Sequence, residues 1–157
     1  MTLTQPVARR MTTFVSTNDA TTFGNSLQDD YTIDLTGDIT VPAAGSTSSA
    51  FTITGVTNLK INGNGYSIKF SSSDSGNGRF FYIDSASEVE MNDVTLENGY
   101  VYSSSSIVYG GAIYLTGSST LTMTSCILTG NTAYVRFNDC VQFYWILPHN
   151  RLNFSSK

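Results

Sequence analysis

The carboxylates best suited to chemistry gather in one stretch of the chain, which contains Asp84, Glu88, Glu90, Asp93 and Glu97. Glu88 and Glu90 alternate with apolar neighbours, so in a strand both would point outward from the same face. A calcium-dependent polysaccharide lyase needs several such oxygens around one ion, together with a base. A glycosidase needs two or three carboxylates within about 5–10 Å of one another. These two reaction classes are the enzymatic hypotheses to weigh.

A structural interpretation of the same carboxylates competes with the enzymatic ones. Lys60 lies 30 residues before Glu90, where one repeat would place the two as a cross-strand ion pair on a solvated sheet. His149, the only histidine, lies in an atypical C-terminal segment without local partners. Cys126 and Cys140 do not have the spacing of a metal or redox pair. We therefore assign no catalytic residue, no metal site and no cofactor, and regard Cys126 as a small buried hydrophobe.

Tyrosines offer a second kind of site, one for binding rather than catalysis. Six of them are expected to point outward from strands or turns: Tyr66, Tyr82, Tyr100, Tyr102, Tyr109 and Tyr114. Exposed tyrosine on a β face often contacts sugars or proteins, although packing against loops is an equally good explanation. The candidate binding residues are Tyr82, Tyr114, Glu88 and Glu90.

The composition limits the partners and the fold class. Of the 157 residues only 13% are charged, the net charge is −4, and eight Lys and Arg form no basic stripe. Nucleic acid is thus not an expected partner. No apolar run is long enough for a transmembrane helix, and no signal peptide is visible in residues 1–16. A single domain is expected, with strands rather than long solvated helices.

An internal repeat of about thirty residues decides the architecture. From Phe51 to Phe81 is 30 residues and from Phe81 to Ile113 is 32, and strand pairs elsewhere shift by the same amounts. Three short strands for each repeat, without helices between them, predict one coil of a solenoid whose equivalent inward residues stack. The ladders expected in the core are Phe51–Phe81–Ile113 and Ile61–Met91–Met123. A third set is Ile68/Phe70, then Val94/Leu96, then Cys126/Leu128.

The sequence therefore predicts an all-β fold, a right-handed parallel β-helix of about four coils with a short N-terminal helical cap. Ala20, Phe23 and Leu27 have helical spacing, and Thr17, Asn18 or Asp19 could cap that helix. Ile33/Leu35 and Ile39/Val41 would form a shorter opening coil, 18 to 20 residues before the next. The turn Asn62-Gly63-Asn64-Gly65 suits positive φ.

We divide the chain into an N-terminal segment and cap (1–30), the β-helix (31–133) and an anomalous tail (134–157). The tail contains the only tryptophan, and the repeat does not continue into it. Two interpretations remain open: a C-terminal cap, or off-frame sequence appended to a truncated gene. An uncovered parallel edge templates association, so end-to-end self-association is also expected.

Two sets of residues resemble known families. Ile61-Asn-Gly-Asn-Gly-Tyr-Ser-Ile68 and Asp93-Val-Thr-Leu-Glu-Asn-Gly99 are similar to the pectin-lyase-like β-helix superfamily. Gly110-Gly-Ala-Ile113 resembles the first motif of polymorphic outer-membrane protein repeats, and Leu128-Thr-Gly-Asn131 matches the second motif, Phe-x-x-Asn, only in its asparagine. The resemblance covers residues 31–133. It implies a secreted or cell-surface setting, in which many such proteins are adhesins.

The functional hypothesis that follows is a non-catalytic surface scaffold or adhesin, whose partner is a carbohydrate or a surface protein. The alternatives are the end of a carbohydrate-active β-helix whose catalytic coils are missing, and a truncated product without function. The motifs of polygalacturonases are absent, which favours the first hypothesis over the second.

Overall fold

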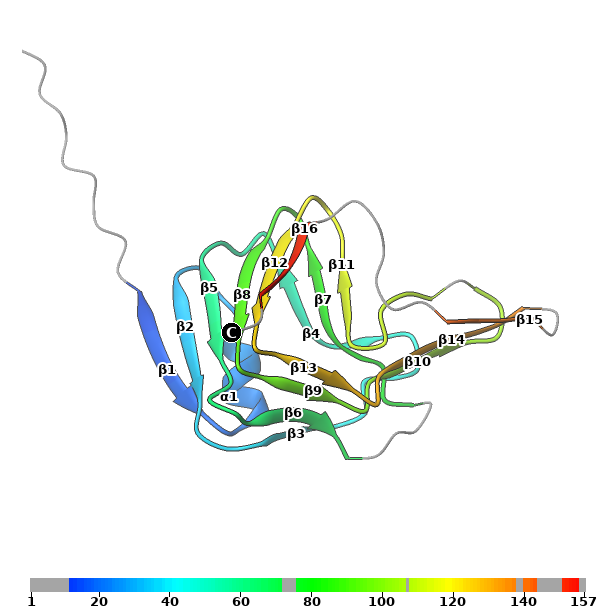
Figure 1. Ribbon diagram of the computed structural model, residues 1–157, viewed down its shortest axis with the longest axis horizontal. Coiled ribbons are helices and arrows are strands. Elements are labelled where there is room, and N and C mark those ends of the chain that lie inside the picture. Colours follow the sequence, from blue (N-terminus) through cyan, green and yellow to red (C-terminus); the bar gives the residue numbers. More distant parts are fainter. Residues whose placement is uncertain (1–11, 72–75, 107, 138–139, 144–150, 156–157) are drawn as a thin grey trace, which may run out of the picture.

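The computed structural model describes residues 12–71, 76–106, 108–137, 140–143 and 151–155, with side chains described as far as residue 134. Within these residues, short strands form the three walls of a parallel β-solenoid, with one short helix at one end (Figure 1). The pectin-lyase-like parallel β-helix predicted from the sequence is confirmed.

Three parallel sheets make up the walls. Sheet A contains, in spatial order, β1 (Thr13–Thr17), β2 (Tyr31–Leu35), β5 (Leu59–Asn62), β8 (Glu88–Asn92), β12 (Thr120–Thr124) and β16 (Arg151–Ser155). Sheet B contains β3 (Ile39–Val41), β6 (Ser67–Phe70), β9 (Thr95–Glu97) and β13 (Ile127–Thr129). Sheet C contains β4 (Ser49–Thr54), β7 (Arg79–Asp84) and β11 (Ile113–Leu115).

The chain visits the sheets in the order A, B, C and then returns to A. The described residues thus form three complete coils and begin a fourth with β12 and β13. A smaller sheet D, made of β10 (Tyr100–Ser103), β14 (Thr132–Phe137) and β15 (Cys140–Phe143), extends sideways from the solenoid (Figure 1). In sheet D, β10 and β14 are parallel, whereas β14 and β15 are antiparallel.

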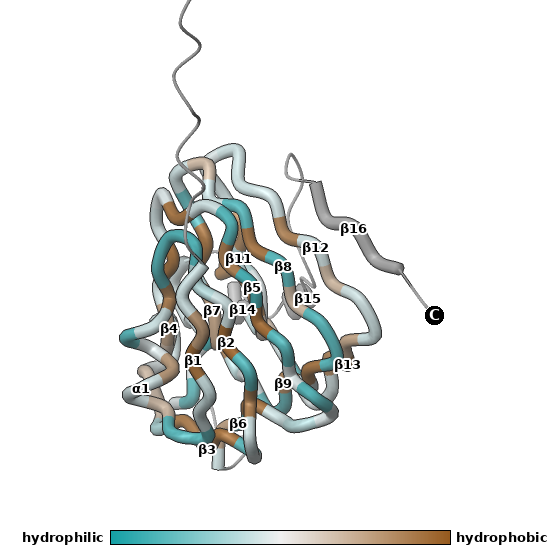
Figure 2. The backbone as a smooth tube through the Cα atoms, turned by 90° about the vertical axis from the view of Figure 1, so that its left-hand side faces the viewer, coloured by the Kyte–Doolittle hydropathy of each residue, from teal (hydrophilic) through white to brown (hydrophobic). Residues whose placement is uncertain are grey.

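The core lies inside the walls and consists of the predicted ladders. Phe51, Phe81 and Ile113 are register partners, as are Ile61, Met91 and Met123, and all of them are buried. Apolar and polar residues alternate along the strands because successive side chains point to opposite faces of a sheet (Figure 2).

Two details of the predicted register are wrong. The opening strands are not a shorter coil, because Ile33 pairs with Ile61 and Ile39 with Ile68, a full coil later. Ile68 also pairs with Leu96 instead of Val94. The turn from Asn62 to β6 is two residues longer than the turn from Asn92 to β9, and this difference moves the third strand.

The predicted helical cap is present as α1 (Ala20–Asn25), whose first turn is capped by Asp19 through a 2.7 Å hydrogen bond from the Thr22 N–H. Phe23 is fully buried and meets the Phe51 ring edge-on at 5.0 Å. A Cβ on Gly24 would come within 3.3 Å of the same ring, so the glycine lets the helix approach the core closely. The sequence missed β1, which precedes the helix and extends sheet A beyond β2.

The tail interpretations stay predictions, although the tail contributes strands to two sheets. β16 pairs with β12 in parallel, with Leu152 opposite Leu121 and Phe154 opposite Met123. The division of the chain into 1–30, 31–133 and 134–157 likewise stays a proposal. His149 and Trp145 lie outside the described residues.

Candidate functional site

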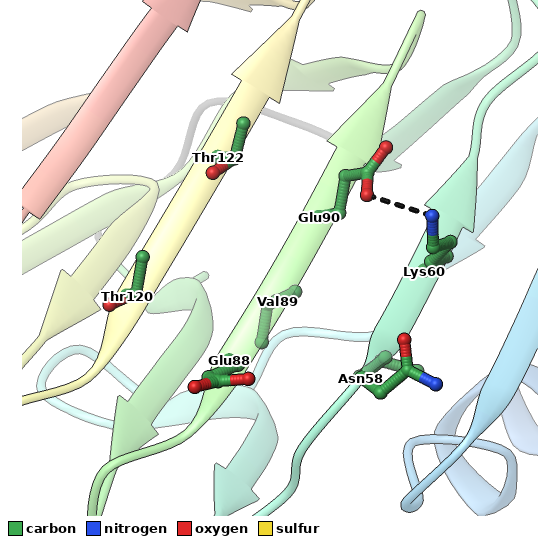
Figure 3. A pocket seen from close by; sticks show the side chains of 8 residues that line it. Asn58, Lys60, Glu88, Val89, Glu90, Thr120 and Thr122 are labelled. Atoms are coloured by element: carbon green, nitrogen blue, oxygen red, sulfur yellow. Dashed lines mark ion pairs between the residues drawn. The ribbon is translucent and has the colours of Figure 1, made fainter. Parts of the chain in front are cut away.

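The outer face of sheet A carries the predicted carboxylates Glu88 and Glu90. They line a shallow hollow together with Asn58, Leu59, Lys60, Val89, Thr120 and Thr122 (Figure 3). The Glu90 Oε2 atom lies 3.1 Å from the Lys60 Nζ atom, so the predicted ion pair is confirmed. Both side chains are close to half exposed, at 45% and 40%, and such pairs contribute only about 0–1 kcal/mol.

Hydrogen bonds continue the polar ladder beside this ion pair. Asn92 Nδ2 donates to Glu90 Oε1 at 2.9 Å, and Asn62 Nδ2 donates to Asp34 Oδ1 at 2.7 Å. The Asn92 amide, and after it Lys60, lowers the pKa of Glu90 below its ordinary value. A general acid would need a raised pKa, so Glu90 is suited to an ion pair and not to protonating a glycosidic oxygen.

Metal ligation was the other chemistry considered for these carboxylates. In the part of the chain that the structure describes, no three His, Cys, Asp or Glu side chains come together as ligands of one ion would. Cys126 is half-buried against the core, and burial raises the pKa of its thiol. The thiol is thus the packing residue that the sequence predicted and a poor nucleophile.

The outer face of sheet C brings together the two candidate tyrosines. Tyr82 of β7 and Tyr114 of β11 are register partners with ring centroids 5.5 Å apart. The Tyr109 ring lies 5.7 Å from the Tyr114 ring. We call Tyr82, Tyr109 and Tyr114 the tyrosine cluster. The other outward tyrosines lie elsewhere: Tyr66 on a turn of sheets A and B, and Tyr100 and Tyr102 on β10.

Asp84 fixes one end of the tyrosine cluster. The Tyr82 hydroxyl donates to Asp84 Oδ2 at 3.0 Å, and this hydrogen bond raises the pKa of Tyr82. The phenol therefore stays protonated at neutral pH, when it can also accept a hydrogen bond from a ligand.

The Gly-Gly-Ala-Ile motif positions the tyrosines on either side of it. Gly110 has a φ of +63°. A Cβ on Gly111 would lie 2.5 Å from the Thr132 carbonyl carbon, so only glycine lets the third coil pass the fourth here. The motif thus fixes the path of the chain from Tyr109 to Tyr114.

Asn131 is the asparagine of the second motif, and it is buried in the turn that follows β13. Its Oδ1 accepts from the Gly99 N–H and its Nδ2 donates to the Leu96 carbonyl, both at 2.8 Å. The side chain satisfies backbone groups of the coil below, so its role is to join coils.

The sequence did not single out Arg79, whose guanidinium lies over Tyr114 with Cζ 5.4 Å from the ring centroid. The cause is a break in the alternation of β7. The N–H groups of Phe80 and Phe81 both donate to the Ala112 carbonyl, which is the two-against-one pattern of a β-bulge. Both phenylalanines are fully buried, and Phe80 stacks on Phe70 at 4.5 Å. The adjacent pair of phenylalanines was the only signal in the sequence.

Comparison with known families identifies the kind of domain. The family model of the pectate lyase-like adhesive domain matches residues 12–135, which is most of the chain. The chain belongs to this family. Searches of curated proteins and of solved structures gave no significant match. The match begins at β1 and extends into β14, so the pectate lyase-like adhesive domain includes all three walls and the tyrosine cluster.

Proposed function

We propose that this pectate lyase-like adhesive domain is a non-catalytic binding module of a secreted or cell-surface protein, with the outer face of sheet C as its binding face. The observation that carries the proposal is the tyrosine cluster on that face, in a chain whose family is described as adhesive. Tyrosine rings supply rigid contact area together with a hydroxyl for hydrogen bonds, which suits the recognition of sugars or proteins.

The alternative of a carbohydrate-active enzyme has one specific feature in its favour, the hollow beside Glu88 and Glu90. Figure 3 shows the Glu90 carboxylate turned towards Lys60, with Glu88 apart from that pair. A hydrolytic pair would need one carboxyl held protonated, but the pKa of Glu90 is lowered. Binding without turnover is therefore the better account of this face as well.

The setting is proposed from the family and from the earlier resemblance. An adhesive domain acts where other surfaces can be met, which is outside the cell or on its exterior. Among the described residues, no helix is both long and apolar enough to span a membrane.

Binding to immobilised glycans and to cell-surface proteins tests the proposal, with the Tyr82→Ala/Tyr114→Ala double variant against Tyr66→Ala as the matched control. Loss of two central aromatic anchors should weaken binding at least about 10-fold, while the control should bind like the wild type. Equal binding by all three proteins would contradict the sheet C site. Release of reducing ends or unsaturated sugars by the wild type, lost in Glu90→Gln, would favour the enzyme instead.

Self-association is proposed at the N-terminal end of the solenoid. β1 is the outermost strand of sheet A there, and Phe14 on it is highly exposed. Exposed strand edges pair with other chains, and a charge on the strand discourages this. We expect Phe14→Lys to lower the concentration-dependent mass seen by light scattering. A wild-type protein that stays monomeric at every concentration would contradict this proposal.

A further inference from the structure

Arg79 is a buried cation without a carboxylate partner among the described residues. Its side chain is only 8% exposed. Two contacts of the guanidinium are described: Nη1 donates weakly to Ser49 Oγ at 3.5 Å, and Cζ lies over the Tyr114 ring. The buried Nε–H has no hydrogen-bond partner at all. Buried arginines are normally paired, because an unpaired charge away from water is costly.

The fold holds this cation against the tyrosine cluster. The bulge at Phe80 and Phe81 is anchored by two buried rings, so Arg79 cannot leave without disturbing the core. The Tyr114 ring under the guanidinium is the central one of the cluster, with Tyr82 and Tyr109 as neighbours. A positive charge that the free protein leaves unsatisfied thus lies beside the surface proposed to bind.

The chemistry of this arrangement specifies the ligand. A guanidinium presents a planar set of donors that matches the two oxygens of a carboxylate. Around it the outer face of sheet C offers phenol rings and hydroxyls, including Thr52, the register partner of Tyr82. The large hydrophobic residues exposed elsewhere, Phe14, Tyr66 and Ile127, do not belong to this sheet. Rings and hydroxyls without an aliphatic patch suit a sugar better than a protein hot spot.

We propose that Arg79 binds the carboxylate of an acidic glycan, with adjoining sugar rings against the tyrosine cluster. This inference rests on the proposed binding role of sheet C and adds the charge and class of the ligand. It goes beyond the family description, which specifies adhesion and no ligand.

Calorimetric titration with two oligosaccharides of equal length tests the charge preference. Hyaluronan fragments carry a glucuronate carboxylate in each repeat, and chito-oligosaccharides are neutral. The full chain should bind the acidic fragments at least about 10-fold more tightly. Arg79→Met should abolish this preference, and Arg79→Lys should retain part of it. Lys69→Gln, which removes the same charge from sheet B, should leave the preference intact.

Thermal unfolding separates binding from a merely structural role. Because Arg79 is buried and unpaired, Arg79→Met should melt at the same temperature as the wild type or about 2–4 °C higher. The acidic fragments should raise the melting temperature of the wild type and not that of Arg79→Met. A markedly lower melting temperature for Arg79→Met would overturn the inference in favour of a structural arginine.

The remaining outcomes distinguish this inference from the proposed function. Equal binding of both oligosaccharides by the wild type and Arg79→Met, lost in Tyr82→Ala/Tyr114→Ala, would overturn the role of Arg79 and keep the binding face. An equal loss of preference in Lys69→Gln would reduce the effect to net charge and overturn it too. Tight binding of an acidic peptide with no binding of hyaluronan would overturn the glycan class. No change in any binding on altering the tyrosines would overturn the proposed function itself.

Discussion

The turn between β5 and β6 allows two glycines of one motif to be compared under matched conditions. The sequence attributed both Gly63 and Gly65 to a need for positive φ. In the structure only Gly65 has it, at +81°, and a Cβ there would meet nothing within 4 Å. A Cβ on Gly63 would overlap the backbone of the next coil, with the Asp93 carbonyl carbon 2.6 Å away. Gly63→Ala and Gly65→Ala therefore test steric overlap and backbone strain separately.

The expected cost of Gly63→Ala follows from what must move. The obstructing atoms are backbone and cannot rotate away, so the two coils must separate locally. Overpacking of this kind costs about 1–3 kcal/mol. Two hydrogen bonds between the coils weaken with it, Gly63 N–H to Asn92 O at 2.7 Å and Gly65 N–H to Asp93 O at 3.0 Å. At about 0.5–1.5 kcal/mol each, they bring the expected loss to about 3–5 kcal/mol.

Gly65→Ala should cost only the strain of a left-handed alanine, about 1–2 kcal/mol. Urea unfolding followed by far-ultraviolet circular dichroism measures both variants against the wild type, with the midpoint shift reporting stability as long as the slope stays constant. A Gly65→Ala variant as unstable as Gly63→Ala, or less stable, would refute the argument that close approach of the coils selects Gly63.

Two further perturbations address the cap and the outer face of sheet A. Phe23→Ala should destabilise the fold by about 3–5 kcal/mol, because the fully buried ring leaves a cavity against Phe51; an unchanged urea midpoint would show that α1 does not close the core. Because the folded-state pKa of Glu90 is lowered, its ion pair stabilises the protein above the ordinary value of 4.5 and ceases to do so as the pH falls through the lowered value. Acidification should therefore cost the wild type slightly more stability than Glu90→Gln, and identical urea midpoints for both proteins at each pH would contradict this.

The repeat could be predicted because the inward residues of each wall shift by a nearly constant number. Phe51 and Phe81 align as expected because nothing between them departs from one coil length. The opening strands could not be framed in the same way. Apolar pairs look alike on every wall, and Ile33 was compared with Phe51 on sheet C when its partner is Ile61 on sheet A. Only the hydrogen-bond register identifies the wall to which a pair belongs.

The candidate site was predicted in part, and the missing part has a physical cause. Tyr82 and Tyr114 point outward because strict alternation holds at their positions. Alternation fails two residues earlier, where the bulge turns both Phe80 and Phe81 inward. A reading based on a period of two cannot place Arg79 correctly across such a defect. Tyr109 lies in a loop, where the sequence has no periodicity to follow.

The residues that mark the family and the residues proposed to bind are different sets with different tolerances. Gly111 and Asn131 are required where coils pass closely, so they report the fold and carry no information about a ligand. Tyr109 and Tyr114 flank the first motif and project from it. Gly111→Ala should therefore reduce stability and binding together, whereas Tyr114→Ala should reduce binding with a much smaller loss of stability. If Gly111→Ala lost stability yet bound normally, the motif would not be what holds the tyrosine cluster in place, and the ligand would have to be sought on another face.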